Sequence, residues 1–137
     1  MNEVIIVCLG VSDQFKKKLS GYGRIAECGE CSIAIFGENC TVPEKSITAD
    51  RVICLSGIIL TGGRVLCDEI ITASMSSDAT VTLTGIADDR CMLAFNRYAT
   101  DIKGCRIEIN ETPHSFDNSM SNEENLLYLT AKTIIGQ

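Results

Sequence analysis

Tryptophan is absent from the 137-residue chain, histidine occurs once, and aromatic residues make up only 5% of the sequence. With so few aromatic side chains, the hydrophobic core has to be built from Val, Ile, Leu, Ala and Cys. Apolar residues account for 45% and charged residues for 22%, which is the composition of a folded globular protein and not of a disordered one. A chain of this length is expected to form one domain spanning residues 1–137.

Long apolar runs are missing as well. The longest one covers residues 4–11, far below the ~20 residues needed to span a bilayer. Glu3 precedes this run and lysines follow it, which reverses the polarity of a secretion signal. We therefore expect a soluble, cytoplasmic protein that does not enter a membrane.

The charge balance disfavours nucleic acid as a partner. Eighteen Asp and Glu against twelve Lys and Arg give a formal net charge of −6. Binding to a duplex needs several cations that displace counterions from the phosphates. The only dense basic run, Lys16-Lys17-Lys18, falls on a short predicted helix, where we interpret it as a solvated face.

Cysteine is the residue type in excess, with eight copies. Because no secretion signal is expected and the core is large enough to need no disulfides, we predict free thiols in a reducing compartment. Five of the cysteines fall within predicted strands, where a free thiol acts as a small buried hydrophobe. These five are Cys8, Cys54, Cys67, Cys91 and Cys105. Cys28, Cys31 and Cys40 remain, and their spacing could bring them together.

The first 37 residues predict a β-α-β-β arrangement. Residues 4–10 form an apolar, β-branched run that ends at a glycine, which is typical of a buried strand. Ser12 is the expected N-cap of a short helix whose apolar stripe is Phe15 and Leu19. Two strands are predicted after it, at residues 24–27 and 32–36.

The middle of the chain is rich in short strand patterns. Turn signals containing Gly, Ser and Asp separate six candidates at intervals of about ten residues. The candidates are residues 46–55, 58–60, 64–72, 80–84, 91–96 and 105–110. Such spacing is typical of a mostly antiparallel sheet. Residues 52–55 do not alternate between apolar and polar, which indicates burial on both faces.

A weak internal repeat offers an alternative to the antiparallel sheet. Residues 51–54 (Arg-Val-Ile-Cys) and 64–67 (Arg-Val-Leu-Cys) match closely. Stacked strands of a β-solenoid would also give many short apolar runs. However, two copies are too few for a repeat architecture, and the spacing does not continue. We therefore favour antiparallel strands.

The end of the chain predicts a polar loop and then a helix. Residues 111–121 are polar, and Ser121 with Glu124 forms a capping box that starts a helix over residues 122–134. The apolar side of this helix is expected to dock on the sheet or on a partner subunit. The fold class is α+β: a single compact domain with a β-α-β-β start, a mostly antiparallel β-sheet middle and a C-terminal helix docked on the sheet.

The sharpest candidate site consists of Cys28, Cys31 and Cys40. The first two form a Cys-x-x-Cys pair, whose thiolates can converge on one metal, so zinc is the candidate ion. The fourth ligand would be Cys8, another distant cysteine or His114, since a second Cys-x-x-Cys pair is missing. The pair could also act as a redox dithiol, but strand patterns on both sides predict a hairpin turn without an activating helix dipole. A structural role for these thiols is the simpler interpretation.

The sequence contains two weaker candidate sites. Cys40 and His114 could form a nucleophile and base if the fold brought them within hydrogen-bond reach. The glycines match no phosphate-binding loop, but backbone amides at the start of the first helix, near Ser12, could hold a small acidic ligand.

No local pattern assembles a catalytic set, so the sequence names no reaction and favours a non-enzymatic role, with enzyme activity left open. One hypothesis is a protein that acts through association, either as a homo-oligomer or as a module that binds an unidentified small ligand. The alternative is a zinc-binding or thiol-redox protein that uses Cys28, Cys31 and Cys40. No cofactor is expected under the first hypothesis, and zinc is the cofactor under the second.

Overall fold

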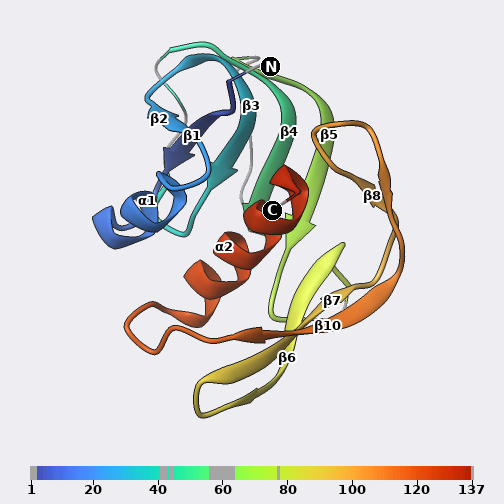
Figure 1. Cartoon of the computed structure of the whole chain (residues 1–137). Helices are drawn as coiled ribbons and strands as arrows, with labels where there is room; N and C mark the ends of the chain where they lie inside the picture. Colours follow the sequence, from blue (N-terminus) through green and yellow to red (C-terminus); the bar gives the residue numbers. More distant parts are fainter. Residues whose placement is uncertain (1–2, 41–42, 44, 56–63, 77, 137) are drawn as a thin grey trace.

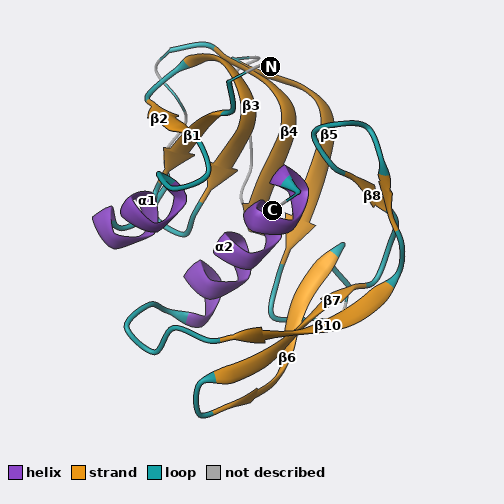
Figure 2. Cartoon of the chain, viewed as in Figure 1, coloured by secondary structure: helices purple, strands orange, loops and turns teal. Residues whose placement is uncertain are grey.

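The computed structural model describes residues 3–40, 43, 45–55, 64–76 and 78–136 (Figure 1). In chain order its elements are β1 (Ile5–Leu9), α1 (Asp13–Leu19), β2 (Arg24–Ala26), β3 (Gly29–Phe36), β4 (Ile47–Leu55), β5 (Val65–Ala73), β6 (Val81–Ala87), β7 (Arg90–Phe95), β8 (Ala99–Thr100), β9 (Arg106–Ile107), β10 (Asn110–Ser115) and α2 (Asn122–Ile135). Eight strands form one sheet in the order β10-β7-β6-β5-β4-β3-β1-β2, and β8 pairs with β9 in a separate ribbon. The predicted α+β class is confirmed (Figure 2).

The first three strands are arranged around β1. β2 pairs with one side of β1 and β3 with the other, both in parallel. α1 connects β1 to β2, and Ser12 caps it by accepting a hydrogen bond from the Phe15 N–H at 3.2 Å. The predicted β-α-β-β start is confirmed. The predicted hairpin turn between Cys28 and Cys31 is wrong, because β2 and β3 are not neighbours and β3 already begins at Gly29.

The middle of the sheet is parallel, so the predicted antiparallel pairing there is wrong. β3, β4, β5 and β6 are neighbours in that order, and each pair runs parallel. Gly29 pairs with Ile47, and Ile47 pairs with Val65, so the step in residue number from β3 to β4 equals the step from β4 to β5. Within the described sheet, antiparallel pairing is confined to β7 with its neighbours β6 and β10.

The number of residues between β3 and β4 is sufficient for the two strands to run parallel. A strand as long as β4 measures about 27 Å, at about 3.3 Å per residue. The segment between β3 and β4, residues 37–46, is long enough when extended to return the chain to the start of the next strand. The similarity between residues 51–54 and 64–67 has no part in this pairing, because Arg51 pairs with Glu69 and not with Arg64. β3, β4 and β5 therefore form a parallel stack with a constant register step instead of the antiparallel sheet that the sequence predicts.

Two segments near the end of the chain also differ from prediction. Residues 105–110 were expected to be one strand but contain only β9 and the first residue of β10. The expected polar loop at 111–121 begins with most of β10. Pro113 made this segment look like a loop, but β10 is the outermost strand, where a proline without an N–H is tolerated. The predicted strand at 58–60 lies outside the described residues.

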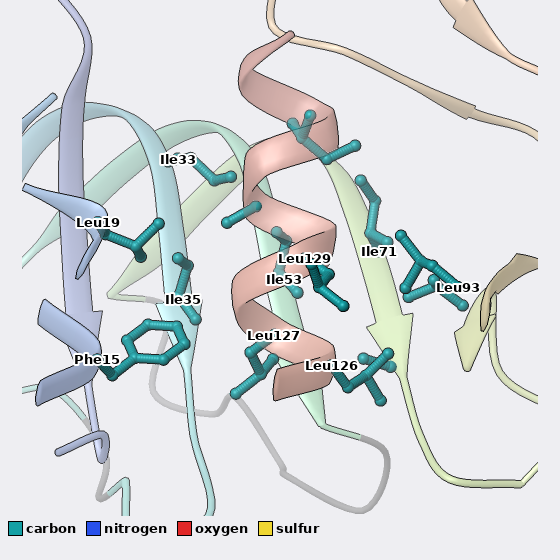
Figure 3. Packing of buried hydrophobic residues seen from close by; sticks show 14 of the residues in the cluster. Phe15, Leu19, Ile33, Ile35, Ile53, Ile71, Leu93, Leu126, Leu127 and Leu129 are labelled. Carbon is teal, nitrogen blue, oxygen red and sulfur yellow. The ribbon is translucent and has the colours of Figure 1, made fainter. Parts of the chain in front are cut away.

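The main core lies between the two helices and one face of the sheet (Figure 3). α2 contributes Leu126, Leu127 and Leu129, and α1 contributes Phe15 and Leu19. The sheet residues of this cluster that Figure 3 labels are Ile33, Ile35, Ile53, Ile71 and Leu93. The predicted docking of the C-terminal helix on the sheet is confirmed. Neither of the two described helices is long and apolar enough to cross a bilayer.

The opposite face of the parallel strands carries a second, smaller apolar cluster. Val7, Ala34 and Val52 lie side by side on β1, β3 and β4, and all three are fully buried. Phe36 and Cys54 form the next cross-strand pair of the same cluster. Because Ile53 and Leu55 are buried on the helix side, the predicted burial of residues 52–55 on both faces is confirmed.

The N-terminus of α2 is bound to that of α1. Ser121 Oγ accepts a hydrogen bond from the Glu124 N–H at 3.1 Å, which confirms the predicted N-cap. The Glu124 carboxylate reaches Ser12 instead of returning to Ser121, and accepts hydrogen bonds from the Ser12 N–H at 2.8 Å and its hydroxyl at 2.7 Å. The Glu124 carboxylate thus binds the Ser12 N–H at the start of the first helix, near where the sequence predicts a small acidic ligand.

A second set of contacts joins α1 to the segment before α2. Asp117 accepts hydrogen bonds from the Ser119 N–H at 2.9 Å and from Lys18 Nζ at 3.1 Å. Hydrogen bonds from Ser119 first, and then from Lys18, lower the pKa of Asp117 to about 2. The Lys18 ammonium also lies 4.3 Å from the centre of the Tyr128 ring on α2. Lys18 therefore contacts both the segment that precedes α2 and the helix itself.

We expect Asp117→Asn to lower the free energy of unfolding at pH 7 but to have little effect near pH 2. The folded-state pKa of about 2 is below the ordinary value of 3.8, so ionisation of Asp117 stabilises the fold above about pH 4. This contribution is lost as the pH falls from about 4 to about 2. Urea unfolding of both proteins across pH 2–7 measures the difference. A difference that stays constant with pH would show that ionisation of Asp117 is not its source.

Leu127→Ala should destabilise the protein by about 2–5 kcal/mol, because Leu127 is fully buried between α2 and the sheet and its truncation leaves a cavity. Leu66→Ala deletes the same atoms from a β5 residue that is 62% exposed, and should cost less than about 0.5 kcal/mol. Chemical denaturation of both variants gives the comparison. Equal losses would contradict the docking of α2 described above.

Candidate ligand-binding crevice

A crevice of about 620 Å³ opens at the carboxyl ends of β1 and β2. The end of β1 contributes Cys8, Leu9 and Gly10, the end of β2 contributes Ile25, Ala26 and Glu27, α1 contributes Lys16, and the segment after β3 contributes Asn39, Cys40, Pro43 and Lys45. Its position follows from the topology. β2 and β3 lie on opposite sides of β1, so the chain connections diverge at the end of β1 and leave a gap there.

Two glycines let the ends of β1 and β3 pass close to each other beside the crevice. Gly10 has a φ of +74°, and a Cβ atom on it would lie 2.2 Å from the Cys40 nitrogen. A Cβ atom on Gly37 would lie 2.4 Å from the Gly10 carbonyl oxygen. The Gly37 N–H instead donates a hydrogen bond to the Leu9 carbonyl at 2.8 Å. A side chain at either glycine would force the two segments apart.

Three charged side chains line the crevice: Lys16, Lys45 and Glu27. Two cations and one anion give the lining a formal charge of +1. The ion pairs among the described residues use other cations, namely Lys18, Arg24, Arg51 and Arg106. Because no described side chain pairs with either lysine ammonium, both charges are available to a ligand.

Two thiols, those of Cys8 and Cys40, also line the crevice. Burial raises the pKa of Cys8 to about 12; the Lys16 ammonium opposes this shift and Cys31 adds to it. Burial also raises the pKa of Cys40. Both sulfurs are therefore protonated at neutral pH and offer a ligand a polarizable, largely apolar surface instead of a nucleophilic thiolate.

The three cysteines predicted as zinc or redox residues lie in different surroundings. Cys31 is buried on β3, where burial first and the Asp50 carboxylate second raise its pKa to about 11. Cys40 packs against the apolar cluster that contains Cys31, and Cys28 directly precedes β3. In the part of the chain that the structure describes, no group of three or more His, Cys, Asp or Glu side chains is arranged to hold a metal. The zinc assignment therefore stays a prediction without a preformed site.

The structure does not bring Cys40 and His114 together. His114 lies on β10 at one end of the sheet, and Cys40 follows β3, with β7, β6, β5 and β4 between them. His114 Nε2 lies 2.9 Å from the Thr112 hydroxyl, and burial together with Lys132 lowers the His114 pKa. Its cross-strand neighbour is Cys91, whose pKa is raised by burial. A smaller cavity of about 430 Å³ at this pair thus holds a neutral imidazole and a protonated thiol.

Comparison with known proteins found no match: no family model, no curated protein and no solved structure matches the chain. Its function therefore has to be inferred from the crevice itself.

Sequence reasoning did not find this crevice as a site. It singled out Cys40 for other reasons and treated Lys16 as part of a solvated helix face, while Glu27 and Lys45 gave no pattern. The available signal was a glycine directly at the end of two predicted strands, Gly10 and Gly37. Such glycines mark a close approach of backbones, but only the parallel topology shows that the two approach each other.

Iodoacetamide should alkylate Cys105 before Cys8, Cys31 and Cys54 in the native protein at pH 8. Cys105 is exposed, whereas burial raises the pKa of Cys8 to about 12 and that of Cys31 and Cys54 to about 11, which leaves almost no thiolate. Peptide mass spectrometry of quenched samples gives the rate at each cysteine, with urea-unfolded protein as the control. Rapid labelling of Cys8 in the native state would contradict its burial beside the crevice.

Proposed function

We propose that the chain is a non-enzymatic module that binds a small organic anion in the crevice at the ends of β1 and β2. The observation that carries this proposal is the pair of lysines, Lys16 and Lys45, that line a cavity of ligand size and have no ion-pair partner among the described residues. The proposal gives a location to the small-ligand module that the sequence predicts.

The charges of the lining select the sign and number of charges on the ligand. In a protein with a formal net charge of −6, two unpaired ammonium groups on one concave surface focus positive potential there. A carboxylate or a phosphate ester placed between them would form charge-assisted hydrogen bonds. The Glu27 carboxylate, which also lines the crevice, repels further negative charge and so favours a ligand with a single anionic group.

The remaining lining favours a ligand with an apolar body. Leu9, Ile25, Ala26 and Pro43 offer hydrocarbon surface, and the thiols of Cys8 and Cys40 add to it. A volume of about 620 Å³ falls in the range of small-molecule sites, roughly 300–1,000 Å³. An organic acid with several carbon atoms fits this combination better than an inorganic ion does.

The position of the crevice and the state of its thiols support binding over catalysis. Open sheets with parallel strands bind their ligands outside the carboxyl ends of the strands, where connections diverge to the two sides of one strand. The part of the crevice lined by the ends of β1 and β2 has this position, and Lys45 reaches the crevice from the segment that leads into β4. Its candidate nucleophiles, Cys8 and Cys40, have raised pKa values and so lack the thiolate that covalent catalysis needs.

The test uses three probes of equal length: hexanoate, 1-hexanol and hexylamine. In ¹⁵N–¹H NMR titrations we expect hexanoate to shift the amide signals of Leu9, Glu27 and Cys40, and to bind at least about tenfold more tightly than 1-hexanol, a difference of about 1.4 kcal/mol. Hexylamine should bind most weakly. Equal affinities for the acid and the alcohol would contradict an anion site.

Lysine variants distinguish binding in the crevice from attraction of the anion by the general surface charge. Lys16→Ala and Lys45→Ala should each weaken hexanoate binding by about tenfold, because each removes one charge-assisted contact. Lys17→Ala is the matched control: it removes the same charge from the same helix, at an exposed position outside the crevice lining. If Lys17→Ala weakens binding as much as Lys16→Ala does, the anion is held by the field of the helix surface and not by the crevice.

A cytoplasmic location and self-association accompany this function as predictions from the sequence. The alternative, a zinc or redox role for Cys28, Cys31 and Cys40, also remains a prediction. Elemental analysis of protein purified without oxygen tests the zinc role, and the reactivity of the native thiols tests the redox role.

A further inference from the structure

β5 has an open hydrogen-bonding edge. It pairs with β4 from Val65 to Ala73, but with β6 at Ala73 alone. Beyond that pair the sheet splits, and β6, β7 and β10 turn away from β5 (Figure 1). From Val65 to Thr72, no strand among the described residues pairs with the side of β5 that faces away from β4. The outward N–H and C=O groups of this stretch form a template on which another strand can pair.

The apolar rows of the sheet reach this edge without cover. Val52 on β4 is fully buried, whereas its partner Ile70 on β5 is 51% exposed. Leu66 lies in a row whose inner members, Glu30 on β3 and Thr48 on β4, are polar and exposed. On the edge strand this row carries a leucine that is 62% exposed. Ile70 thus leaves the end of a buried apolar row uncovered, and Leu66 places an exposed apolar side chain beside polar neighbours. Both features indicate a surface that a partner covers.

The same edge is acidic. Asp68 is exposed on β5, and Asp50 is exposed at the equivalent position of β4, next to it in the stack. Neither carboxylate takes part in an ion pair among the described residues. Glu69, in contrast, is engaged on the α2 side: its carboxylate lies 3.9 Å from Arg51 Nε and accepts a hydrogen bond from the Thr100 N–H at 2.9 Å. The unpaired charge therefore lies where an added strand would run.

This charge decides between two kinds of occupant. If two copies of the chain paired through β5 in the antiparallel sense around Asp68, the two Asp68 carboxylates would lie opposite each other, which destabilises a strand pair. A strand with a lysine or arginine at that position would instead form an opposite-charge pair. The charge thus favours a basic strand from a different protein over a second copy.

We propose that β5 binds an extended, basic segment of a partner protein by strand addition along residues 65–72. Backbone hydrogen bonds to the open edge hold the segment, its apolar side chains cover Leu66 and Ile70, and a cationic side chain pairs with Asp68. This interaction is independent of the crevice, which lies beyond β4 and β3 in the sheet.

The probes are two fluorescein-labelled peptides, Thr-Val-Lys-Val-Lys-Val-Lys-Val-Thr and the same sequence with Glu in place of Lys. Fluorescence anisotropy in low-salt buffer should show that the lysine peptide binds at least tenfold more tightly than the glutamate peptide. Hydrogen exchange of the amides at 65–72 should slow when the lysine peptide is added. A lysine peptide with N-methyl groups on alternate backbone nitrogens should lose binding, because it cannot complete the ladder.

Charge reversal on β5 provides the decisive variant. Asp68→Lys should weaken binding of the lysine peptide at least tenfold and strengthen binding of the glutamate peptide. Asp78→Lys makes the same charge change at an exposed residue outside β5 and should leave both affinities within twofold of the original protein. Equal effects of the two variants, or no exchange protection at 65–72, would overturn the proposal. Light scattering tests for a second copy at this edge. A dimeric mass whose population changes in Asp68→Lys would also overturn the proposal, since a second copy would then occupy the edge.

Discussion

The constant register step between β3, β4 and β5 is the constraint on which the rest of the structure depends. It places Ile35, Ile53 and Ile71 in one row under the helices, and this row is fully buried. The three strands also run in the same direction as β1, so the carboxyl ends of all four lie at the same end of the sheet. The ends of β1 and β2 line the crevice at this end of the sheet. The parallel stack ends at β5, whose outer side is open.

Polar contacts fix the other elements to this stack. Arg51 lies in the row between Ile33 and Glu69, almost completely buried, and donates hydrogen bonds to the Thr100 and Asp101 carbonyls at 3.0 Å. These bonds fix the segment that begins the β8–β9 ribbon to β4, and they satisfy a buried guanidinium that would otherwise be costly. Glu124 does the equivalent for the helices, since it connects the start of α2 to the start of α1. Each contact joins segments far apart in the sequence, so neither could be read from a local pattern.

Local structure was predictable from the sequence, and strand pairing was not. Both helices, their N-caps at Ser12 and Ser121 and most strands follow from local chemistry that acts within a few residues. The sequence does match the register step, since Ile35, Ile53 and Ile71 are evenly spaced, but single isoleucines in apolar runs give no recognisable pattern. The closer match between residues 51–54 and 64–67 drew attention instead, and its failure to continue argued for antiparallel strands. The β10 strand was missed because Pro113 is a loop signal unless the strand is known to lie at an edge.

The candidate site was less predictable than the fold, for the same reason. Its residues come from four separate segments, and their association depends on β2 and β3 lying on opposite sides of β1. Cysteine spacing was the strongest local signal, yet the structure uses the Cys31 and Cys54 thiols as small core residues with raised pKa values.

The charges of this acidic chain are also organised by the stack. The unpaired Lys16 lines the crevice beside the end of β1, whereas the unpaired Asp68 lies on β5, with β3 and β4 between these two strands. Exposed charges interact weakly beyond a Debye length of about 8 Å in physiological salt, and two intervening strands at about 4.8 Å each, together with the far side of β1, exceed that distance. The two surfaces can therefore hold opposite potentials without neutralising each other. A small anion and a basic strand would then bind the same molecule without competing.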